Sequence, residues 1–486
     1  MKKINVVGGG IGGLAVAIRM AVKGYKVKLF ESNDYLGGKM SQINMQGYRF
    51  DTGPSLFTQP HLIEELILLC NKKPEDYFKY HKLKESCRYF FEDQTKIIGY
   101  SDSTLFAKEL SKKTNIESKK VENHLKKSAY LYNSTQSVFL ENSLHKFRTY
   151  FNLKSFIAIC KLPSLDLFTS MSKRNKKRFN NPKVEQIFNR YATYNGSNPF
   201  KAPAILNLIS HLEINQGAYF PENGMRSIAN LLERLCLEMG VQIHTNSKVE
   251  QIDVDQNKVK GIHTKDEFYD SDIVICNQDV YFVYENLLND KKIAKKIQKQ
   301  ERSTSAIIFY WGIKKTFEEL ELHNIFFSKN YKDEFHEICS NHKVPDDPTI
   351  YINISSKKQK NDAPKNCENW FVMVNTPPNK SQDWEKVIAL AKKNIIKKLN
   401  RMLDTSIESY IVCEHVLDPR TIETITGSYQ GSLYGTASNN RKSAFFRHPN
   451  FSKKIKGLYF CGGSVHPGGG IPLALSSAKI VDQLIT

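Results

Sequence analysis

The chain has 486 residues, a length that favours two domains, or two domains with a third inserted piece. Hydrophobic residues make up 40% and charged residues 25%, which fits a folded protein and excludes a disordered one. The net charge of +20 is compatible with nucleic acid, an anionic membrane surface or an acidic ligand, and equally with a general bias towards lysine. No nucleic-acid-binding motif accompanies the charge, so we expect no nucleic acid partner and favour a membrane surface.

The nine cysteines are odd in number, widely spaced and without a Cys-x-x-Cys pair. This pattern argues against a disulfide framework and against a zinc site, so we expect no metal ion. After Met1 the apolar run is short and interrupted by glycines, unlike a signal peptide. No run of about 18 apolar residues occurs, so we expect any membrane contact to be peripheral.

The first 31 residues predict a strand, a glycine turn, a helix and a second strand. The strand covers Ile4–Val7, the helix Leu14–Lys23 and the second strand Lys26–Phe30, directly before Glu31. Between strand and helix lies a run of glycines that matches GxGxxG, with Gly8, Gly10 and Gly13 at the three positions and Gly12 beside the last. This arrangement predicts a dinucleotide-binding βαβ unit.

Each glycine of the motif has a physical role. Gly8 permits the tight turn, Gly10 lets the backbone approach a pyrophosphate, and Gly13 lets helix and strand pack closely. The unpaired N–H groups at the start of the helix favour the phosphates. Glu31 can accept hydrogen bonds from both ribose hydroxyls and would repel a 2′-phosphate, which argues against NADP.

A second glycine cluster follows, and it favours FAD over NAD. Gly37 and Gly38 allow the chain to bend back along the pyrophosphate, and Lys39 adds a cation there. The run from Gly47 to Pro54, which contains Gly53, extends the cluster. An ordinary hairpin turn remains the alternative for these glycines.

The middle of the chain is predicted to be mostly helical from about 103 to 190, after a helix that opens at Pro60. The apolar, aromatic stretch Phe151–Phe168 is followed by Lys173, Arg174, Lys176, Lys177 and Arg178. We interpret Phe151–Arg178 as a membrane-docking segment, because apolar side chains can enter the interface while the basic residues meet anionic headgroups. The alternative is a helix that packs on the core and has a solvated, basic end.

The second half alternates between helices and strands. A helix is predicted at Ile228–Met239, and the strands are predicted at Val241–His244, Val249–Val254, Val259–Lys265, Asp272–Cys276, 304–313, 349–354, Trp370–Asn375 and Leu458–Cys461. A glycine turn and a helix over Leu473–Leu484 end the chain. We predict an α/β (mixed α+β) fold with a Rossmann-like FAD-binding domain, a mixed-sheet substrate domain and a helical, membrane-facing insertion.

The domain boundaries follow from this pattern. We expect three parts of the FAD-binding domain at 1–85, 216–300 and 426–486. Between them we expect a helical substrate- or membrane-associated region at 86–215 and a substrate-binding sheet domain at 301–425.

Several motifs resemble the bacterial carotenoid (phytoene) desaturase family, within the flavin amine oxidase-like superfamily. The motifs are Gly37–Lys39, Phe50–Pro54, Tyr191–Pro199, Tyr219–Met225 and, most specifically, Gly462–Pro472. The segments Gly38–Ser41, Phe50–Thr58 and Cys87–Asp93 are more similar to hydroxycarotenoid 3,4-desaturases than to phytoene desaturases. Where the family often has Gly-Gly-Met, this chain has Asn223-Gly-Met, and because Asn also adopts the left-handed conformation we expect the turn to be preserved.

The resemblance implies FAD as cofactor, a hydrophobic carotenoid as substrate, and a cytoplasmic protein attached peripherally to the inner face of the cell membrane. It implies that the ADP half of FAD contacts Gly8, Gly10, Gly12, Gly13, Glu31, Gly38, Lys39 and Gly53, with Val249 at the adenine. It also implies that the flavin and ribityl chain lie near Gly462, Gly463, Gly470, Ile471 and Pro472. The last helix would direct its N-terminus at the flavin N1–C2=O edge.

The resemblance further implies hydride transfer from an allylic C–H to flavin N5 in a dry tunnel, with oxygen or a quinone as electron acceptor. We hypothesise that Arg190, Tyr194, His211 and Glu213 line that tunnel as catalytic residues. A purely structural role, with buried side chains satisfied by the backbone, is the alternative for each of them. Nothing in the chain suggests a second nucleotide site for NAD.

Other functions remain open at this point. The same motifs occur in phytoene desaturases and in carotenoid isomerases or saturases, and the fold occurs in amine oxidases and protoporphyrinogen oxidases. Amine oxidases would have an aromatic cage, which this sequence does not reveal. A non-enzymatic alternative is a prenyl-type lipid escort protein, against which the intact segment Gly462–Pro472 argues.

Overall fold

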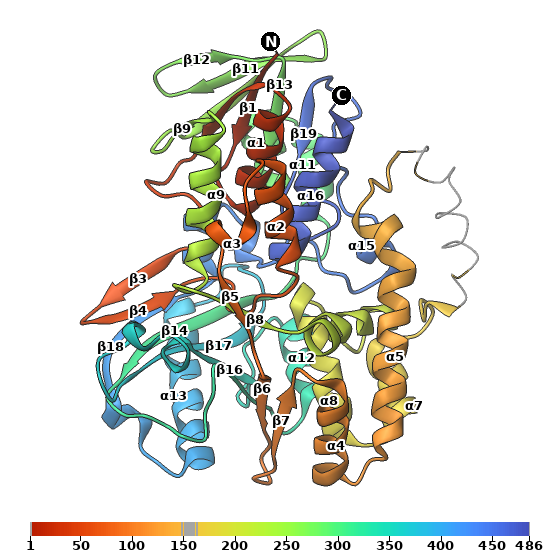
Figure 1. The fold of residues 1–486 in the computed structure, drawn as a ribbon, viewed down its shortest axis with the longest axis vertical. Coiled ribbons are helices and arrows are strands. Elements are labelled where there is room, and N and C mark those ends of the chain that lie inside the picture. Colours follow the sequence, from red (N-terminus) through yellow and green to blue (C-terminus); the bar gives the residue numbers. More distant parts are fainter. Residues whose placement is uncertain (1, 147–148, 150–160, 162–163, 486) are drawn as a thin grey trace.

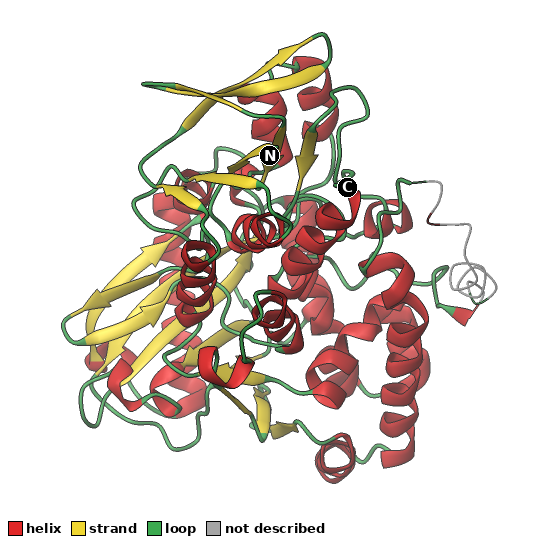
Figure 2. Ribbon diagram, turned by 45° about the horizontal axis from the view of Figure 1, so that its top comes forward, coloured by secondary structure: helices red, strands yellow, loops and turns green. Residues whose placement is uncertain are grey.

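The architecture is that of a computed structural model, which describes residues 2–146, 149, 161 and 164–485. Both termini lie in the upper part of Figure 1, where a parallel sheet is flanked by helices. A second, larger sheet lies below it, and Figure 2 shows its strands grouped on one side while helices fill the other. The predicted mixed α/β fold is confirmed.

The upper sheet has five parallel strands drawn from three distant parts of the chain. Their order is β19-β13-β1-β2-β9, with β1 in the centre. The bounds are β1 Lys3–Val7, β2 Lys26–Phe30, β9 Gln242–His244, β13 Ile273–Cys276 and β19 Leu458–Phe460. Four of the five residues of β1 and all four of β13 are buried, as expected for parallel strands covered on both faces. A small antiparallel sheet is attached through β10 Val249–Asp255, β11 Lys258–Thr264 and β12 Phe268–Asp270.

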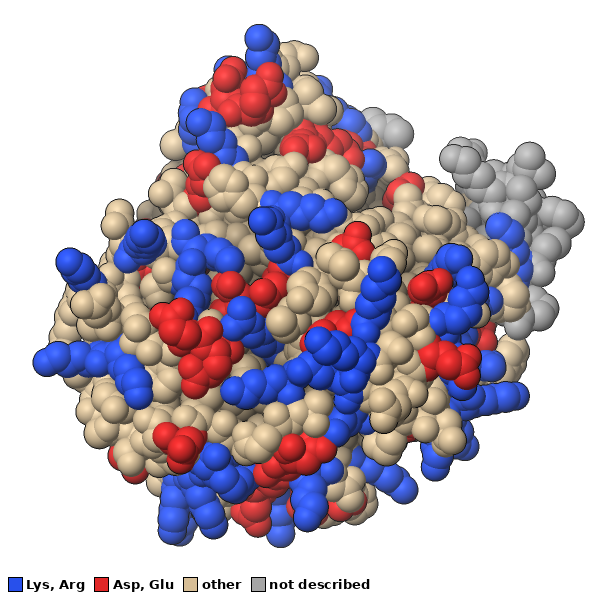
Figure 3. All heavy atoms as spheres, turned by 60° about the horizontal axis from the view of Figure 1, so that its bottom comes forward, with Lys and Arg blue, Asp and Glu red and all other residues tan. Residues whose placement is uncertain are grey.

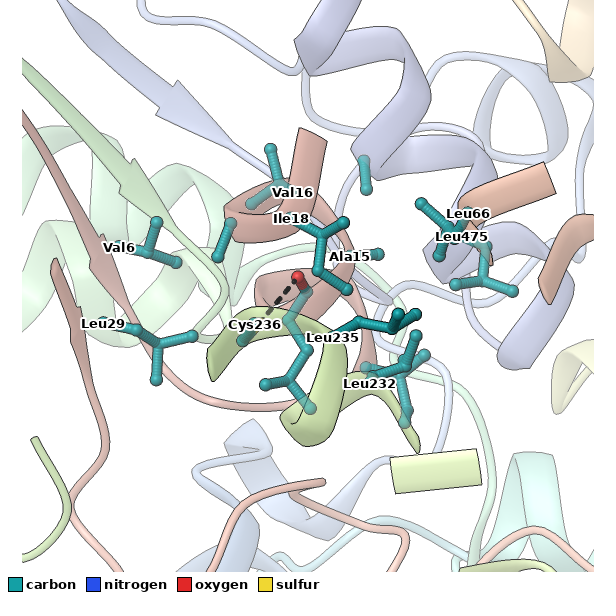
Figure 4. Packing of buried hydrophobic residues seen from close by; sticks show 14 of the residues in the cluster. Val6, Ala15, Val16, Ile18, Leu29, Leu66, Leu232, Leu235, Cys236 and Leu475 are labelled. Carbon is teal, nitrogen blue, oxygen red and sulfur yellow. Dashed lines mark hydrogen bonds between the residues drawn. The ribbon is translucent and has the colours of Figure 1, made fainter. Parts of the chain in front are cut away.

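The helix after the first glycine turn forms the core of this part. Helix α1, Ile11–Val22, is buried from Ile11 to Met20 and lies between α9, Arg226–Glu238, and α16, Ile471–Leu484. Figure 4 shows Val16 and Ile18 of α1 among leucines of α9, α16 and α2 (His61–Leu69). Each fully buried aliphatic side chain contributes about 1.5–3 kcal/mol relative to exposure. This packing fixes where the first glycine turn lies.

The lower sheet is mixed and has seven strands in the order β18-β14-β17-β16-β15-β6-β7. Their bounds are β6 Glu85–Phe90, β7 Lys96–Tyr100, β14 Ser305–Ile313, β15 His323–Phe326, β16 Ile350–Ile354, β17 Glu368–Thr376 and β18 Ile411–Leu417. One face packs on helix α13, Trp384–Leu403, through a cluster that contains Trp311 and Trp370. The strands predicted at 304–313, 349–354 and 370–375 are confirmed as β14, β16 and β17, whereas β6, β7, β15 and β18 were not predicted.

Helices fill the region that the sequence predicts to be helical. They are α4 Ser103–Thr114, α5 Ser118–Thr135, α7 Met171–Phe179 and α8 Pro182–Asn189, followed by a 3₁₀ turn over Arg190–Asn195. Asp102, Ser170 and Asn181 cap the starts of α4, α7 and α8 by accepting backbone N–H groups. Of the predicted membrane-docking segment Phe151–Arg178, residues 151–160 and 162–163 lie outside the described residues.

The carboxylate of Asp51 links the motif Phe50–Pro54 to the motif Tyr219–Met225. Asp51, at the end of strand β4 (Tyr48–Asp51), accepts backbone N–H groups from Met225 at 2.9 Å and Arg226 at 3.0 Å, at the start of α9. The Arg49 guanidinium pairs with Asp51 at 2.8 Å. The turn before α9 contains Asn223 at φ 66°, so the left-handed conformation expected for this residue is confirmed.

Replacing Asp51 by Asn tests this link between β4 and α9. The amide cannot accept as strongly as the carboxylate and removes the charge opposite Arg49. We expect the free energy of unfolding to fall by about 2–3 kcal/mol, since hydrogen bonds to charged groups contribute that much. Urea denaturation of D51N and of D266N, which removes an exposed carboxylate, provides the measurement and its control. Equal stability of the two variants would contradict the assigned role.

Candidate active site

A single cavity of about 1480 Å³ connects the upper and lower parts of the protein. One end is lined by residues of both glycine turns together with Glu31 and Val249. The other end is mostly apolar and is lined by Ile205, Leu208, Ile209, Leu212, Ile308, Ile325, Phe371 and Met373. A polar, glycine-walled end therefore opens directly into an apolar chamber.

The two glycine turns touch each other at one wall of this cavity. A Cβ atom on Gly12 would lie 3.2 Å from the Cα of Gly462, so neither turn has room for a side chain at the contact. Within the first turn, a Cβ on Gly13 would lie 2.0 Å from the carbonyl oxygen of Gly8. Gly13 thus permits the close approach of helix and strand for which the motif requires it.

Asn277, which the sequence analysis missed, lies between the two turns. It follows strand β13 directly, and its side-chain Nδ2 donates to the backbone oxygen of Cys461 at 3.2 Å. A Cβ added to Gly10 would lie 2.7 Å from Asn277 Oδ1, and one added to Gly462 would lie 2.3 Å from Nδ2. The side chain therefore fills the space that the glycines leave and holds the carboxy-terminal turn against the amino-terminal one. Its place at the carboxyl end of a buried parallel strand is the only signal that the sequence offers.

Glu31 lies at the polar end of the cavity, and its carboxylate accepts hydrogen bonds from nearby backbone N–H groups. One carboxylate oxygen accepts the N–H of Gly9 at 2.7 Å, and the other accepts the N–H of Asn33 at 3.0 Å. These bonds fix the carboxylate at the end of β2, where it lines the cavity. Val249, at the start of β10, lines the same end.

The second glycine cluster folds back onto the first. The N–H of Gly37 donates to the carbonyl of Gly9 at 2.8 Å, and a Cβ on Gly38 would lie 3.2 Å from Gly10. Gly37 and Gly38 have φ values of 103° and 59°, which favour glycine. The chain thus folds back onto the first turn, and its predicted course along a pyrophosphate stays a prediction. Gly53 packs tightly in the same place, since a Cβ there would lie 1.9 Å from the carbonyl oxygen of Lys39.

The C-terminal turn ends in a helix whose first residues line the cavity. Gly470 has a φ of 105° and its missing Cβ would meet nothing within 4 Å. Helix α16 starts at Ile471, with Pro472 in its first turn and no side-chain cap. Ile471, Pro472, Gly462 and Gly463 all line the cavity. The start of α16 thus offers uncapped backbone N–H groups at the cavity wall.

Arg190 forms a buried polar cluster at the apolar end. Its guanidinium donates to Glu213 at 2.7 Å and to Tyr194 at 2.7 Å, and it also bonds the hydroxyl of Tyr89. Burial opposes the charge of Arg190, but Glu213 and the neighbouring tyrosines together outweigh burial and raise the pKa of Arg190. Burial also raises the pKa of Tyr194, so its hydroxyl stays protonated and bonds Glu213.

The four residues predicted to be catalytic do not all reach the cavity. Arg190 and Tyr194 line it, whereas Glu213 lies behind them with 1% of its side chain exposed. His211 is not among the described lining residues. Its ring lies 5.3 Å from that of Tyr132, and Asn215 bonds its Nδ1 at 2.8 Å. The structure therefore gathers three of the four into one cluster.

Comparison with known proteins places this geometry in a family. Residues 11–485 match the family of flavin containing amine oxidoreductases. The chain belongs to this family. It is 50% identical to a 1-hydroxycarotenoid 3,4-desaturase from Flavobacterium sp. (strain P99-3), over 100% of this chain and 99% of the relative. It is 32% identical to a 4,4′-diapolycopene oxygenase from Methylomonas sp., over 100% and 98% of the two chains.

A solved structure has the same fold. An oxidoreductase from Methanosarcina mazei superposes with a TM-score of 0.65 at 14% identity, covering 99% of this chain and 100% of that one. The resemblance to carotenoid desaturases of the flavin amine oxidase-like superfamily is confirmed, and the chain is an FAD-dependent oxidoreductase.

The charges near the cavity fit the FAD of this family. Lys39, Arg302 and Arg447 are three cations whose partners line the cavity: Arg302 pairs with Asp279, whereas Lys39 and Arg447 donate to the backbone oxygens of Leu433 and Tyr434. Burial lowers the pKa of Lys39 to about 8 and that of Arg447 to about 10, as expected where positive charge is incompletely neutralised. A bound diphosphate would supply the missing negative charge. Lys39 lines this end of the cavity, and its contact with a pyrophosphate stays a prediction.

Replacing Asn277 by Leu tests the contact between the two turns. Leu has a similar size, but it cannot donate to Cys461 and it crowds the glycines. We expect FAD affinity to fall by about tenfold to hundredfold, because the cradle is no longer held in shape for the cofactor. Titration of the apoprotein with FAD, followed by flavin fluorescence, gives the affinity. Asn44→Leu, on an exposed strand, is the matched control, and an unchanged affinity in N277L would contradict the role of Asn277.

Proposed function

We propose that this protein is a carotenoid desaturase that introduces a C=C bond into a polyene, and specifically that it carries out C-3,4 desaturation of a 1-hydroxy carotenoid. The observation that carries the proposal is the continuous cavity, which joins the glycine-walled end to a long apolar chamber. The relative that is 50% identical over the whole chain bears the name of this reaction. A substrate without polar groups at its reacting carbons needs such a dry chamber.

We assign the polar end of the cavity to the cofactor. In this proposal the ADP half contacts the first glycine turn, Glu31, Lys39 and Val249, and the flavin half contacts the turn that ends at Pro472. The uncapped start of α16 would favour negative charge on the reduced ring through its helix dipole. Gly13 is the one predicted cofactor residue that does not line the cavity among the described residues, and its role is to pack α1 on β1.

The reaction needs little chemistry from the side chains. When bound, FAD accepts a hydride at N5 from an allylic carbon. The adjacent carbon loses a proton to a base or to water, so the substrate loses two hydrogens and gains one double bond. The apolar lining excludes bulk water and holds the chain in one orientation. In this proposal oxygen or a quinone would be the final electron acceptor.

Arg190 and Tyr194 are the polar groups that we propose to contact the substrate on one side of the chamber. Glu213 is a positioning residue in this proposal, because it holds both side chains in place from behind. His211 has no such link to the cavity. Its geometry is that of a residue bonded within its own helical turn.

Replacing Tyr194 by Phe separates a role in the reaction from a role in folding. The variant keeps the ion pair between Arg190 and Glu213 and removes one hydroxyl. We expect FAD content to be retained and kcat/KM for a 1-hydroxy carotenoid to fall about tenfold, because the hydroxyl's hydrogen bonds to Arg190 and Glu213 are both lost and Arg190 is no longer held in place. The lengthening of the polyene absorption measures turnover. His211→Asn is the control, with a change below about twofold. Unchanged turnover in Y194F would assign the cluster to structure alone.

The same assay separates the alternatives. A phytoene desaturase would oxidise phytoene in place of the hydroxylated substrate. An isomerase or saturase would need reduced flavin and would produce no net oxidation. A non-enzymatic escort protein would bind lipid without a yellow, reducible flavin.

We propose further that the protein associates peripherally with a membrane surface, from which a carotenoid can enter. Within the described residues no helix is long and apolar enough to span a bilayer. Two exposed aromatic side chains support the proposal: Phe168 is 76% exposed and Phe446, next to the cavity-lining Phe445, is 52% exposed. The Arg441 guanidinium lies 4.6 Å above the ring of Phe168.

Basic residues contribute less to this surface than the sequence predicts. Arg174 and Arg178 both pair with Asp166, at 2.8 and 2.7 Å, while Lys173, Lys176 and Lys177 remain exposed. Over the face shown in Figure 3, Lys and Arg side chains are spread with acidic side chains among them. The aromatic residues are therefore the sharper test of membrane binding.

The variant F168S/F446S should lose membrane binding. Burying each ring in the interface contributes up to about 1.5–3 kcal/mol, so we expect the partition coefficient to fall by at least about tenfold. Sedimentation with vesicles that contain anionic lipid measures it. Leu237→Ser, which removes an exposed apolar side chain from α9, is the control. Equal binding of the double variant and the wild type would contradict this docking surface.

A further inference from the structure

Three hydroxyl- or ring-bearing side chains form a hydrogen-bonded chain on the cavity wall, outside the Arg190 cluster. Ser55, after strand β4, bonds the hydroxyl of Tyr351 on β16 at 2.7 Å. Tyr351 bonds Nδ1 of His323 on β15 at 2.7 Å. All three residues line the cavity, and neighbouring lining residues such as Leu56, Ile325 and Phe371 are apolar.

The direction of these hydrogen bonds is fixed from the far end of the chain. The amide nitrogen of Asn353 donates to the backbone oxygen of Leu322 at 3.1 Å, so this atom is a donor and not the amide oxygen. The same nitrogen lies 3.2 Å from Nδ1 of His323, so Nδ1 accepts, and its single lone pair is shared between this amide and the closer hydroxyl of Tyr351. His323 is 3% exposed, and burial lowers its pKa to about 3, so the ring is neutral. With Nδ1 as acceptor the proton lies on Nε2, which is buried and has no hydrogen-bond partner among the described residues.

The acceptor role of His323 Nδ1 determines the hydrogen-bond directions of Tyr351 and, through Tyr351, of Ser55. Because Nδ1 accepts, Tyr351 uses its only proton to donate to His323. Tyr351 can then only accept from Ser55, so Ser55 uses its own proton in that bond. The Ser55 oxygen keeps acceptor capacity alone. A side chain that is formally both donor and acceptor is thus restricted by its neighbours to one role.

The position of Ser55 indicates which ligand group its acceptor oxygen would face. Ser55 is partly exposed, lines the cavity and follows Gly53 by two residues. Gly53 packs against the backbone of Lys39 in the turn that contacts Gly10, so Ser55 lies at the junction of the glycine-walled end and the apolar chamber. In a 1-hydroxy carotenoid only C2 separates the hydroxyl-bearing carbon from C3, so the hydroxyl must lie close to the reacting bond.

We propose that Ser55, oriented by Tyr351 and His323, is the acceptor that recognises the hydroxyl group of the substrate and selects an alcohol over an ether. The inference rests on the proposed function and names the group that sets its specificity. An alcohol can donate to the Ser55 oxygen. A methyl ether at the same carbon has no proton to donate. Its oxygen would face the Ser55 oxygen, and two acceptors cannot form a hydrogen bond.

The test compares a 1-hydroxy carotenoid with its 1-methoxy ether and with the parent polyene that lacks oxygen. We expect the FAD-loaded wild type to prefer the alcohol over the ether by about tenfold to hundredfold in kcat/KM, the range for one hydrogen bond made or left unmade in a buried site. In Ser55→Ala this ratio should fall to near one, and in Ser55→Thr it should be retained. Ser406→Ala, an exposed serine, is the matched control and should keep the wild-type ratio.

Tyr351→Phe gives an independent readout that loss of structure cannot mimic. Without its acceptor, Ser55 is free to rotate and to donate its proton towards the cavity. Activity on the methyl ether should therefore rise by at least about fivefold relative to the alcohol, the equivalent of one weak hydrogen bond. The preference for the alcohol should not change between pH 6 and 8, because His323 stays neutral over that range. FAD absorbance confirms that each variant is folded.

The outcomes separate this inference from the proposed function. If the FAD-loaded wild type desaturates none of the three polyenes, the proposed function fails. If it desaturates them without preferring the alcohol, or if S55A keeps the wild-type preference, the desaturase assignment stands and the role of Ser55 is refuted. If Y351F leaves the ratio unchanged, the orientation by Tyr351 and His323 is refuted.

Discussion

The structure depends on the direct contact between two glycine turns that lie some 450 residues apart in the chain. Neither turn has space for a side chain where they meet, and Asn277 fills the gap between them. The contact requires β1, β13 and β19 to be neighbours in one parallel sheet, because each turn follows the carboxyl end of its strand. Parallel sheets bind ligands at that edge, where several turns converge. The cavity wall that we assign to the cofactor therefore depends on the order of the strands in this sheet.

The sequence predicts the parts of this wall that carry a local pattern. The glycines of both turns, Glu31 at the end of β2 and the return of the chain at Gly37 and Gly38 all follow from short-range spacing, and the structure brings them to one cavity. Asn277 has no such pattern, since a single Asn after a buried strand has many ordinary explanations. Its role depends on Cys461, 184 residues further along the chain. Only the fold reveals that contact.

The second sheet shows a similar limit of prediction from the sequence. Strands β14, β16 and β17 are long and apolar, so their periodicity predicts them. Strand β15 has only four residues, and its cavity-facing residues His323 and Ile325 give no alternating pattern that could be recognised. Ser55 and Tyr351 are separated by 296 residues, so no spacing rule connects them. The polar groups on which specificity would depend are therefore the ones that sequence reasoning is least able to find.

Polar side chains inside an apolar chamber need a physical reason, because each unpaired group costs about 1–3 kcal/mol. The Arg190 cluster meets most of this cost internally, since Glu213 and three tyrosines surround the guanidinium and only its Nε lacks a partner among the described residues. The Ser55 chain is different. Its hydrogen bonds run from Asn353 to Ser55 and leave an acceptor at the Ser55 end, towards the cavity, while Nε2 of His323 has no partner among the described residues. In the Arg190 cluster the hydrogen-bonding groups of Arg190 and Tyr194 are mostly engaged with Glu213 and with each other, whereas the Ser55 chain presents one acceptor to the cavity and discriminates between ligands. That difference is why we assign recognition of the substrate hydroxyl to Ser55 and not to the better-shielded ion pair.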